Sequence, residues 1–347
     1  MPPEALGWLT ALVASAAITG VVRLYAFRAG ILDLPNSRSS HDSPTARGGG
    51  LAILGVWTAA LIIIHLAGGL PESLTYALLI GGLLVGSIGF LDDRRGVSPT
   101  ARIIVHFVSG GLFMALVNPT LEVQFAQYVL SNQVIGWILA IVLIVWLINL
   151  FNFMDGVDGI AGTEAAFVMI GAVIVGTFTP GERDPVFYAV ENLQLIFASA
   201  CLGFLVWNWP PARIFLGDVG SGLLGFVIGA FLVYSVSQGL LNVWTWLILT
   251  GVFVVDATLT LLRRLLGGER WYEAHRSHAY QRVARRAQSH TFVTAGVLTV
   301  NCFWLLPMAC LAQASPEAAW LYWIAAWVPL VLVWLHIDRR ERLTAAA

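Results

Sequence analysis

Residues 134–159 read VIGWILAIVLIVWLINLFNFMDGVDG, an almost uninterrupted apolar run that ends in two aspartates and two glycines. About 20 apolar residues in a helix cross the roughly 30 Å hydrocarbon core of a membrane, so the run predicts a membrane-spanning helix. Asp155 and Asp158 then lie where that helix meets water. A carboxylate in hydrocarbon is costly, so such residues either cap the helix or face a wet cavity that holds a cation or a polar ligand. Both interpretations stay open for this stretch alone.

The composition of the whole chain is that of an integral membrane protein. Of its 347 residues 58% are hydrophobic and only 11% are charged, with a mean hydropathy of +0.79. Soluble domains carry about 25% charged residues. The net charge of −1 gives no reason to expect nucleic acid as a partner, and every basic residue other than histidine is an arginine. Cys201, Cys302 and Cys310 lie in apolar runs without metal-ligand spacing, so we expect them to be buried as small hydrophobes.

Hydropathy predicts an all-α bundle of about eleven membrane-spanning helices that form one domain over residues 1–347. The predicted spans are about 5–27, 49–67, 73–91, 100–117, 134–153, 160–178, 187–207, 219–237, 242–264, 291–312 and 318–336. The first of them lacks a basic leading segment, so we expect a span and not a cleaved signal. With the N-terminus outside, 18 of the 19 arginines fall on inner segments, and only Arg183 falls outside. This bias predicts an N-out, C-in topology.

The same topology gathers the polar segments on the inner side. These segments are residues 33–50, 92–102, 155–159, 208–221 and 263–290. In the first, Arg38, His41 and Arg47 beside a glycine triplet suit a phosphate, although a basic loop on the inner side would look similar. In the second, the adjacent Asp92 and Asp93 favour either a cation between them or simple termination of the helix.

The later inner segments hold further candidates for a site. Asp218 precedes a Gly/Ser-rich helix start, where it could cap the helix or bind a metal. Phe215 could stack on a base or anchor the chain at the membrane interface. The segment His275–Arg282 has two histidines with flanking arginines, which suit phosphate or a solvated loop. Asp256 lies inside the ninth span and is either functional or bonded between helices.

Five motifs together resemble one known family. DLPNSRSSHDSPTARGGG, GFLDDRRGVSPTAR, NLFNFMDGVDGIAG, NWPPARIFLGDVGSG and HRSHAYQR are similar, in this order, to the motifs of the polyprenyl-phosphate N-acetylhexosamine-1-phosphate transferases. The resemblance covers residues 33–282. It implies ten or eleven helices and transfer of a sugar-1-phosphate from a UDP-sugar to undecaprenyl phosphate, with release of UMP. It also implies Mg²⁺, with Mn²⁺ as the alternative, and an active site on the cytoplasmic side of the bacterial inner membrane.

The resemblance also implies roles for residues of this sequence. The expected metal ligands are Asp218, Asp155 and Asp92. The expected catalytic residues are Asp92, Asp93, Asp155, Asp158 and His278. The expected substrate-binding residues are Asn152, Asn208, Phe215, Arg47, His41, Arg102, Arg276 and Arg282. Asp92 resembles an aspartate that acts either as a base on the lipid phosphate or as a metal ligand. Because that phosphate is already ionised at neutral pH, we favour the electrostatic role.

Three features separate this chain from parts of the family. Tyr280 and Gln281 stand where later histidines of the loop motif often occur, and Arg47 and Arg102 stand where lysines do. The motif forms resemble the subgroup that begins O-antigen or other surface glycans, with GlcNAc or a 6-deoxy sugar such as FucNAc or QuiNAc. The alternatives are phospho-N-acetylmuramoyl-pentapeptide transferase and, from another class, an ion-coupled transporter. A homodimer stays an open alternative.

Overall fold

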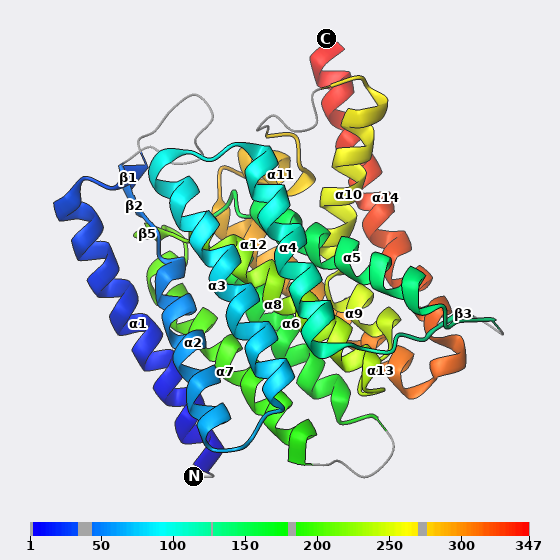
Figure 1. Cartoon of the computed structure of the whole chain (residues 1–347). Coiled ribbons are helices and arrows are strands. Elements are labelled where there is room, and N and C mark those ends of the chain that lie inside the picture. The colour runs from blue at the N-terminus through cyan, green and yellow to red at the C-terminus, as the bar shows by residue number, and fades with distance from the viewer. Residues whose placement is uncertain (1–2, 34–43, 126–127, 180–184, 270–275, 347) are drawn as a thin grey trace.

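The protein is an all-α bundle in a computed structural model, and about 80% of the residues that the structure describes are helical (Figure 1). The structure describes residues 3–33, 44–125, 128–179, 185–269 and 276–346. His41 therefore lies outside the described residues. The helices of the first half are α1 (Pro3–Ala29), α2 (Gly50–Leu66), α3 (Glu72–Arg95), α4 (Pro99–Val117), α5 (Gln133–Met154), α6 (Ile160–Gly176) and α7 (Pro185–Asn208). Those of the second half are α8 (Asp218–Ser237), α9 (Val243–Leu249), α10 (Gly251–Leu266), α11 (Ala279–Ala287), α12 (His290–Val300), α13 (Leu306–Ala314) and α14 (Ala319–Ala346). A π-helix, η1 (Asn301–Leu305), joins α12 to α13, and a 3₁₀-helix, η2 (Pro316–Ala318), precedes α14.

The predicted apolar segments are all helical where the structure describes them. Within the described residues, eight helices are long and apolar enough to cross a membrane. α9 and α10 together correspond to one further predicted span, but they bend by 80° at Thr250. α2 and α6 are apolar and shorter. The two termini lie at opposite ends of the bundle (Figure 1).

α8 is the central helix of the bundle. In its most apolar 18-residue window 94% of the residues are buried, and α2, α3, α5 and α6 pack around it. Glycines on α8 let neighbouring backbones come close, which is how apolar helices associate where water provides no driving force. At Gly225 the nearest atoms belong to the backbone of Leu147 and Ile148 on α5, and at Gly220 they include Gly50 of α2. The first half of α8 therefore lies directly against the backbones of two neighbouring helices, α2 and α5.

Gly50 and Gly55 should respond in opposite ways to replacement by alanine. A methyl group on Gly50 would overlap the backbone of Gly220, whereas one on Gly55 meets no atom within 4 Å. We expect Gly50→Ala to cost about 1–3 kcal/mol of stability, as overpacking does. Gly55→Ala, on the same helix, should be neutral or stabilise by about 0.5–1 kcal/mol. Thermal unfolding in detergent measures both, and equal midpoints for the two variants would contradict the packing described here.

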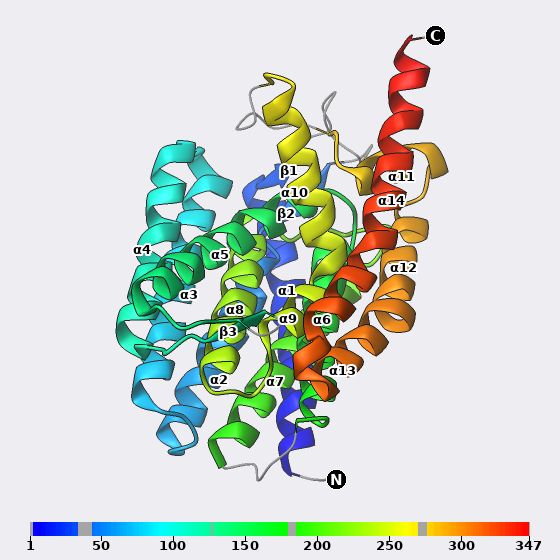
Figure 2. The same ribbon diagram turned by 90° about the vertical axis from the view of Figure 1, so that its right-hand side faces the viewer.

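Short strands join the first inner segment to the start of α8. β1 (Leu32–Asp33) pairs antiparallel with β2 (Thr45–Arg47), and β2 pairs parallel with β5 (Ile214–Phe215). Beyond the strands, the backbone N–H groups of Gly49 and Gly50 donate to the carbonyls of Phe215 and Leu216 at 2.9 and 2.8 Å. We call the end of the bundle with β1, β2, β5 and α11 the site end (Figure 1). A hairpin of β3 (Val123–Phe125) and β4 (Tyr128–Leu130) lies elsewhere, beside α9 and α14 (Figures 1 and 2).

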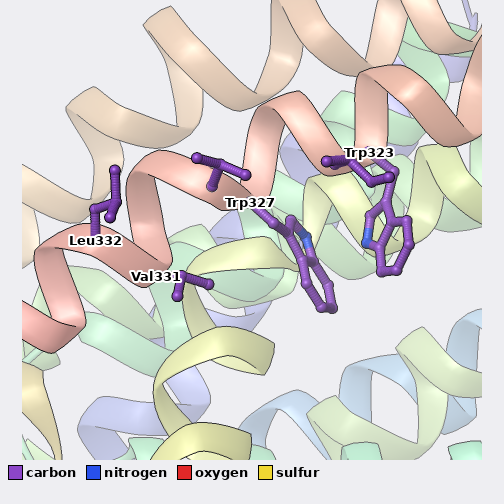
Figure 3. A pocket seen from close by; sticks show the side chains of 6 residues that line it. Trp323, Trp327, Val331 and Leu332 are labelled. Atoms are coloured by element: carbon purple, nitrogen blue, oxygen red, sulfur yellow. The ribbon is translucent and has the colours of Figure 1, made fainter.

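α10 and α14 run side by side and extend past the bundle at the site end (Figure 2). The outer face of α14 carries a shallow apolar groove of about 370 Å³, in which the rings of Trp323 and Trp327 lie 5.0 Å apart (Figure 3). All residues that line it belong to α14: Trp323, Ile324, Trp327, Val328, Val331 and Leu332. An exposed apolar face on a helix of a membrane protein is typical of contact with lipid.

Candidate active site

Asp93 fixes the start of α8. Its Oδ1 accepts the backbone N–H of Asp218 at 2.9 Å, and its Oδ2 accepts that of Val219 at 3.3 Å. A carboxylate here accepts hydrogen bonds from two amide groups that the first turn of a helix leaves unpaired. Its negative charge also interacts favourably with the positive end of the helix dipole. The side chain of Asp93 is only 6% exposed. The last turn of α3 thus determines where Asp218 stands.

Asp218 is the point at which four separate segments meet. Its Oδ1 lies 3.0 Å from Arg47 Nη2 of β2 and 3.0 Å from Asn152 Nδ2 of α5. Its Oδ2 lies 3.1 Å from Arg102 Nη1 of α4. Asn152 Nδ2 also lies 3.1 Å from Oγ of Ser221, one turn into α8. The structure therefore brings together residues from three of the predicted inner segments, 33–50, 92–102 and 208–221, and from the end of α5.

The two arginines bridge pairs of carboxylates. Arg47 Nε lies 2.8 Å from Asp93 Oδ1, so its guanidinium spans Asp93 and Asp218. Arg102 pairs with Asp92 as well as with Asp218, so Nη1 of one guanidinium lies between these two carboxylates. Asp92 Oδ1 accepts the N–H of Val97 at 2.6 Å, just beyond the end of α3. These interactions link three aspartates and two arginines in one network of ion pairs.

Asp155 belongs to the same electrostatic network. It follows the last residue of α5, and its charge interacts with those of Asp218, Arg47, Asp93 and Asp158. Desolvation, and then the neighbouring Asp218 carboxylate, raise the pKa of the Asp155 carboxyl well above its usual range. A cation placed between Asp155 and Asp218 would remove this repulsion and favour ionisation of both.

Asp158 and Asn208 brace the turn between α5 and α6. Asp158 Oδ2 accepts the N–H of Ala212 at 2.9 Å, and its Oδ1 lies 3.2 Å from His290 Nδ1. Asn208 Oδ1 accepts the N–H of Gly159 at 3.0 Å, while its Nδ2 donates to the carbonyl of Ile214 at 2.9 Å. Both side chains thus tie the Asp155–Gly159 turn to residues 208–214. Their expected roles in catalysis and uridine binding stay predictions.

The remaining predicted residues lie around this network. Phe215 is half-buried in β5, where it is in register with Arg47. His278 is buried directly before α11, at the site end. Arg282 is buried on α11 and pairs with Asp338 of α14 at 2.9 Å. Arg276 is partly buried, and its carbonyl accepts Nη1 of Arg285.

The sequence analysis did not single out Ser221 or His290. Ser221 stands three residues after Asp218, at the spacing that puts two side chains on one helix face, so its position carried a usable signal. His290 begins α12 far along the chain, and nothing in its neighbourhood pointed to Asp158.

The oxygen ligands present are of the type that a hard divalent cation takes. Mg²⁺ is usually held by one or two carboxylates together with substrate phosphates and water. Asp92 and Asp218 both pair with Arg102, and the charge of Asp155 interacts with that of Asp218, so three carboxylates lie near one another where a divalent cation could bind. Within the described residues no three metal-ligating side chains already converge on one point, so the remaining ligands would have to come from substrate and water. The side chains present therefore fit a Mg²⁺ ion that takes its remaining ligands from substrate and water.

Comparisons with known proteins agree on one family. Residues 75–236 match the model of glycosyl transferase family 4. The chain is 31% identical over 316 residues to a decaprenyl-phosphate N-acetylglucosaminephosphotransferase of Mycolicibacterium smegmatis, covering 82% of this chain and 76% of that protein. It is 24% identical over 335 residues to a probable undecaprenyl-phosphate N-acetylglucosaminyl 1-phosphate transferase of Bacillus subtilis, covering 94% of this chain and 88% of that protein.

Relatives with another donor also match. The chain is 31% identical over 224 residues to a phospho-N-acetylmuramoyl-pentapeptide-transferase of a Picosynechococcus species, covering 60% of this chain and 56% of that protein. The matches to N-acetylglucosamine transferases extend further along both chains. Phosphotransferases of this kind generally use a divalent metal. The chain is therefore a multi-pass membrane transferase that belongs to the polyprenyl-phosphate N-acetylglucosamine-1-phosphate transferases of glycosyl transferase family 4.

Proposed function

We propose that this protein transfers N-acetylhexosamine-1-phosphate from a UDP-sugar to undecaprenyl phosphate and releases UMP, as the first membrane step of a surface polysaccharide. The proposed setting is the bacterial inner membrane, with the site on the cytoplasmic side and Mg²⁺ as the cation. The observation that carries the proposal is the meeting of Arg47, Arg102 and Asn152 on the Asp218 carboxylate. A site of alternating carboxylates and guanidinium groups suits a metal-bound pyrophosphate, because both partners find their opposite charge.

The reaction needs charge stabilisation more than a strong base. An oxygen of the lipid phosphate attacks the phosphorus that carries the sugar, and the bond to the UMP oxygen breaks. Bound Mg²⁺ would neutralise the negative charge that develops on the phosphate of the leaving UMP. Asp218, Asp155 and Asp92 are the residues proposed to hold the ion. Arg47 and Arg102 are placed to contact phosphate oxygens, since a guanidinium can exchange a carboxylate for a phosphate without losing its geometry.

N-acetylglucosamine is the first donor to test. The relatives that match over 94% and 82% of this chain are named for it, whereas the muramoyl-pentapeptide enzymes match over 60% and 67% of it. The motif forms favour an O-antigen or other surface-glycan enzyme, for which a 6-deoxy sugar is the further candidate. Tyr280 offers little surface to the methyl group of such a sugar, because it is 5% exposed and its hydroxyl donates to the carbonyl of Phe153 at 2.9 Å. Phospho-N-acetylmuramoyl-pentapeptide transfer stays the second candidate.

The test is a comparison of donors with purified protein. UMP release is measured with undecaprenyl phosphate and UDP-GlcNAc, UDP-FucNAc, UDP-QuiNAc or UDP-MurNAc-pentapeptide, each with and without Mg²⁺. We expect an N-acetylhexosamine donor to give the fastest release, and only with the metal present. Equal or faster turnover of UDP-MurNAc-pentapeptide would replace the proposed donor. No release of UMP from any of the four would reject the proposed function.

The orientation of the chain can be tested independently of activity. In a variant without Cys201, Cys302 and Cys310, a cysteine at Ser277 should resist an impermeant thiol reagent in intact cells and react after lysis. A cysteine at Ser315, between α13 and η2, should react in intact cells. The 18-to-1 distribution of arginine motivates both expectations. The reverse labelling pattern would invert the topology and move the site to the outside.

A further inference from the structure

Asp256 is a buried carboxylate whose bonds reach the segment with the predicted histidine. It lies on α10 and is 6% exposed. Its Oδ1 accepts the N–H of Ala279 at 2.9 Å, and its Oδ2 accepts the N–H of Tyr280 at 2.9 Å. These are the first two amides of α11, which have no partner within their own helix. A carboxylate from another helix therefore caps α11 and determines where that helix begins.

The same carboxylate faces His278. Nδ1 of His278 lies 3.6 Å from Asp256 Oδ1, and the hydroxyl of Thr260 donates to that oxygen at 3.0 Å. A carboxylate beside one nitrogen of an imidazole restrains the ring and favours the hydrogen on that nitrogen. Asp256 thus fixes the backbone of the segment and one edge of the histidine ring together.

The other side of this segment contacts the stretch that ends in Asp155. The ring of Phe153 lies over that of His278, with centroids 6.3 Å apart, and the carbonyl of Phe153 accepts the Tyr280 hydroxyl. At Gly156 a methyl group would overlap the Tyr280 hydroxyl and the Gln281 side chain. His278 is therefore clamped between α10 and the residues that immediately precede Asp155.

A second tether of α11 provides a contrast. Asp338 of α14 pairs with Arg282 at 2.9 Å and with Arg263 at 2.6 Å. It is 5% exposed, so Asp256 and Asp338 are both buried carboxylates that hold α11. Asp338 holds α11 through arginine side chains, whereas Asp256 lies beside the ring of His278. The two tethers should therefore differ in what their loss does to the histidine.

We propose that Asp256 is a positioning residue for the transfer reaction, which acts by holding His278 against the stretch that ends in Asp155. The inference rests on the proposed function, because His278 is expected to contact the pyrophosphate of the donor. It assigns no contact with substrate to Asp256 itself. Loss of its carboxylate should reduce turnover only as long as His278 is present.

The experiment is a double-mutant cycle on purified protein. Asp256→Asn should lower kcat about ten- to a hundredfold, the range typical of a carboxylate behind a functional histidine, with a smaller change in KM for the donor. In a His278→Gln background the same substitution should change kcat less than about twofold. Asp338→Asn, the matched control, should lower kcat by the same factor in both backgrounds. Thr260→Val, which keeps the carboxylate but removes one donor, should show a weaker form of the dependence on His278.

Each outcome decides for or against the inference. Equal loss from Asp256→Asn in both backgrounds would overturn it and leave Asp256 a structural cap like Asp338. If Asp256→Asn fails to fold, Thr260→Val takes its place in the cycle. Hydrogen exchange is read in parallel, because the amides of Ala279 and Tyr280 should lose protection in Asp256→Asn. Unchanged exchange at these two amides would overturn the inference, whether or not the wild-type chain releases UMP. A wild-type chain that releases no UMP would by itself count only against the proposed function.

Discussion

Asp218→Asn should reduce UMP release by about a thousandfold while the protein still folds. Both oxygens of Asp218 contact cationic side chains, and the neighbouring carboxyl of Asp92 makes this the proposed centre of the metal site. Asparagine keeps the shape but supplies one neutral oxygen in place of a charged carboxylate. The loss of charge at a metal–pyrophosphate site costs several kcal/mol, and about 4 kcal/mol corresponds to about a thousandfold.

The measurement is UMP release at saturating donor, together with thermal unfolding of the same sample. Glu122→Gln is the matched control, because it also neutralises a carboxylate but lies exposed before β3, remote from the site end (Figure 1). It should keep full activity. A folded Asp218→Asn protein with more than about a tenth of the wild-type rate, a loss of less than about 1.4 kcal/mol, would remove Asp218 from the site.

Asp92→Asn should lower kcat about a hundredfold and raise the Mg²⁺ concentration needed for half-maximal rate. The asparagine oxygen can still accept the N–H of Val97, so the end of α3 should keep its structure. What is lost is the charge that pairs with Arg102 beside Asp218. About 2.7 kcal/mol, the equivalent of a hundredfold, is a reasonable size for one charge of a shared network.

The dependence on Mg²⁺ separates the two roles considered for Asp92. If Asp92 helps to bind the cation, added Mg²⁺ should recover part of the lost rate. If it acts as a base on the lipid phosphate, the loss should be the same at every Mg²⁺ concentration. That second result would contradict the electrostatic role favoured here, and it would leave the place of Asp218 unaffected.

The helices were predictable from the sequence, because each apolar run has to be helical to satisfy its backbone in lipid. The parity of the spans also predicted that Asp92, Asp93, Asn152 and Asp218 would gather at one end, and they do. Their chemical roles stay predictions. The 80° bend between α9 and α10 was not predictable, since residues 242–264 read as one apolar run.

The detailed partners of the polar residues were beyond the reach of the sequence. Asp158 and Asn208 were expected to face substrate, yet they also carry hydrogen bonds to the backbone of distant segments. Asp256 was singled out only as a carboxylate inside a span, and its two amides lie on α11. Such pairings depend on how the helices pack in three dimensions, which hydrophobic periodicity does not encode.

The parallel pairing of β2 with β5 has a consequence for the biogenesis of the protein. Arg47 is in register with Phe215, so β2 has only β1 as a pairing strand until α1 to α7 have been synthesised. Asp93 likewise cannot accept hydrogen bonds from the amides of Asp218 and Val219 until these two residues have been synthesised. Contacts between such distant segments form late, since their loop must close first. Ribosome-bound chains halted before Ile214 should therefore expose the 44–50 segment to protease, and chains released after α8 should protect it.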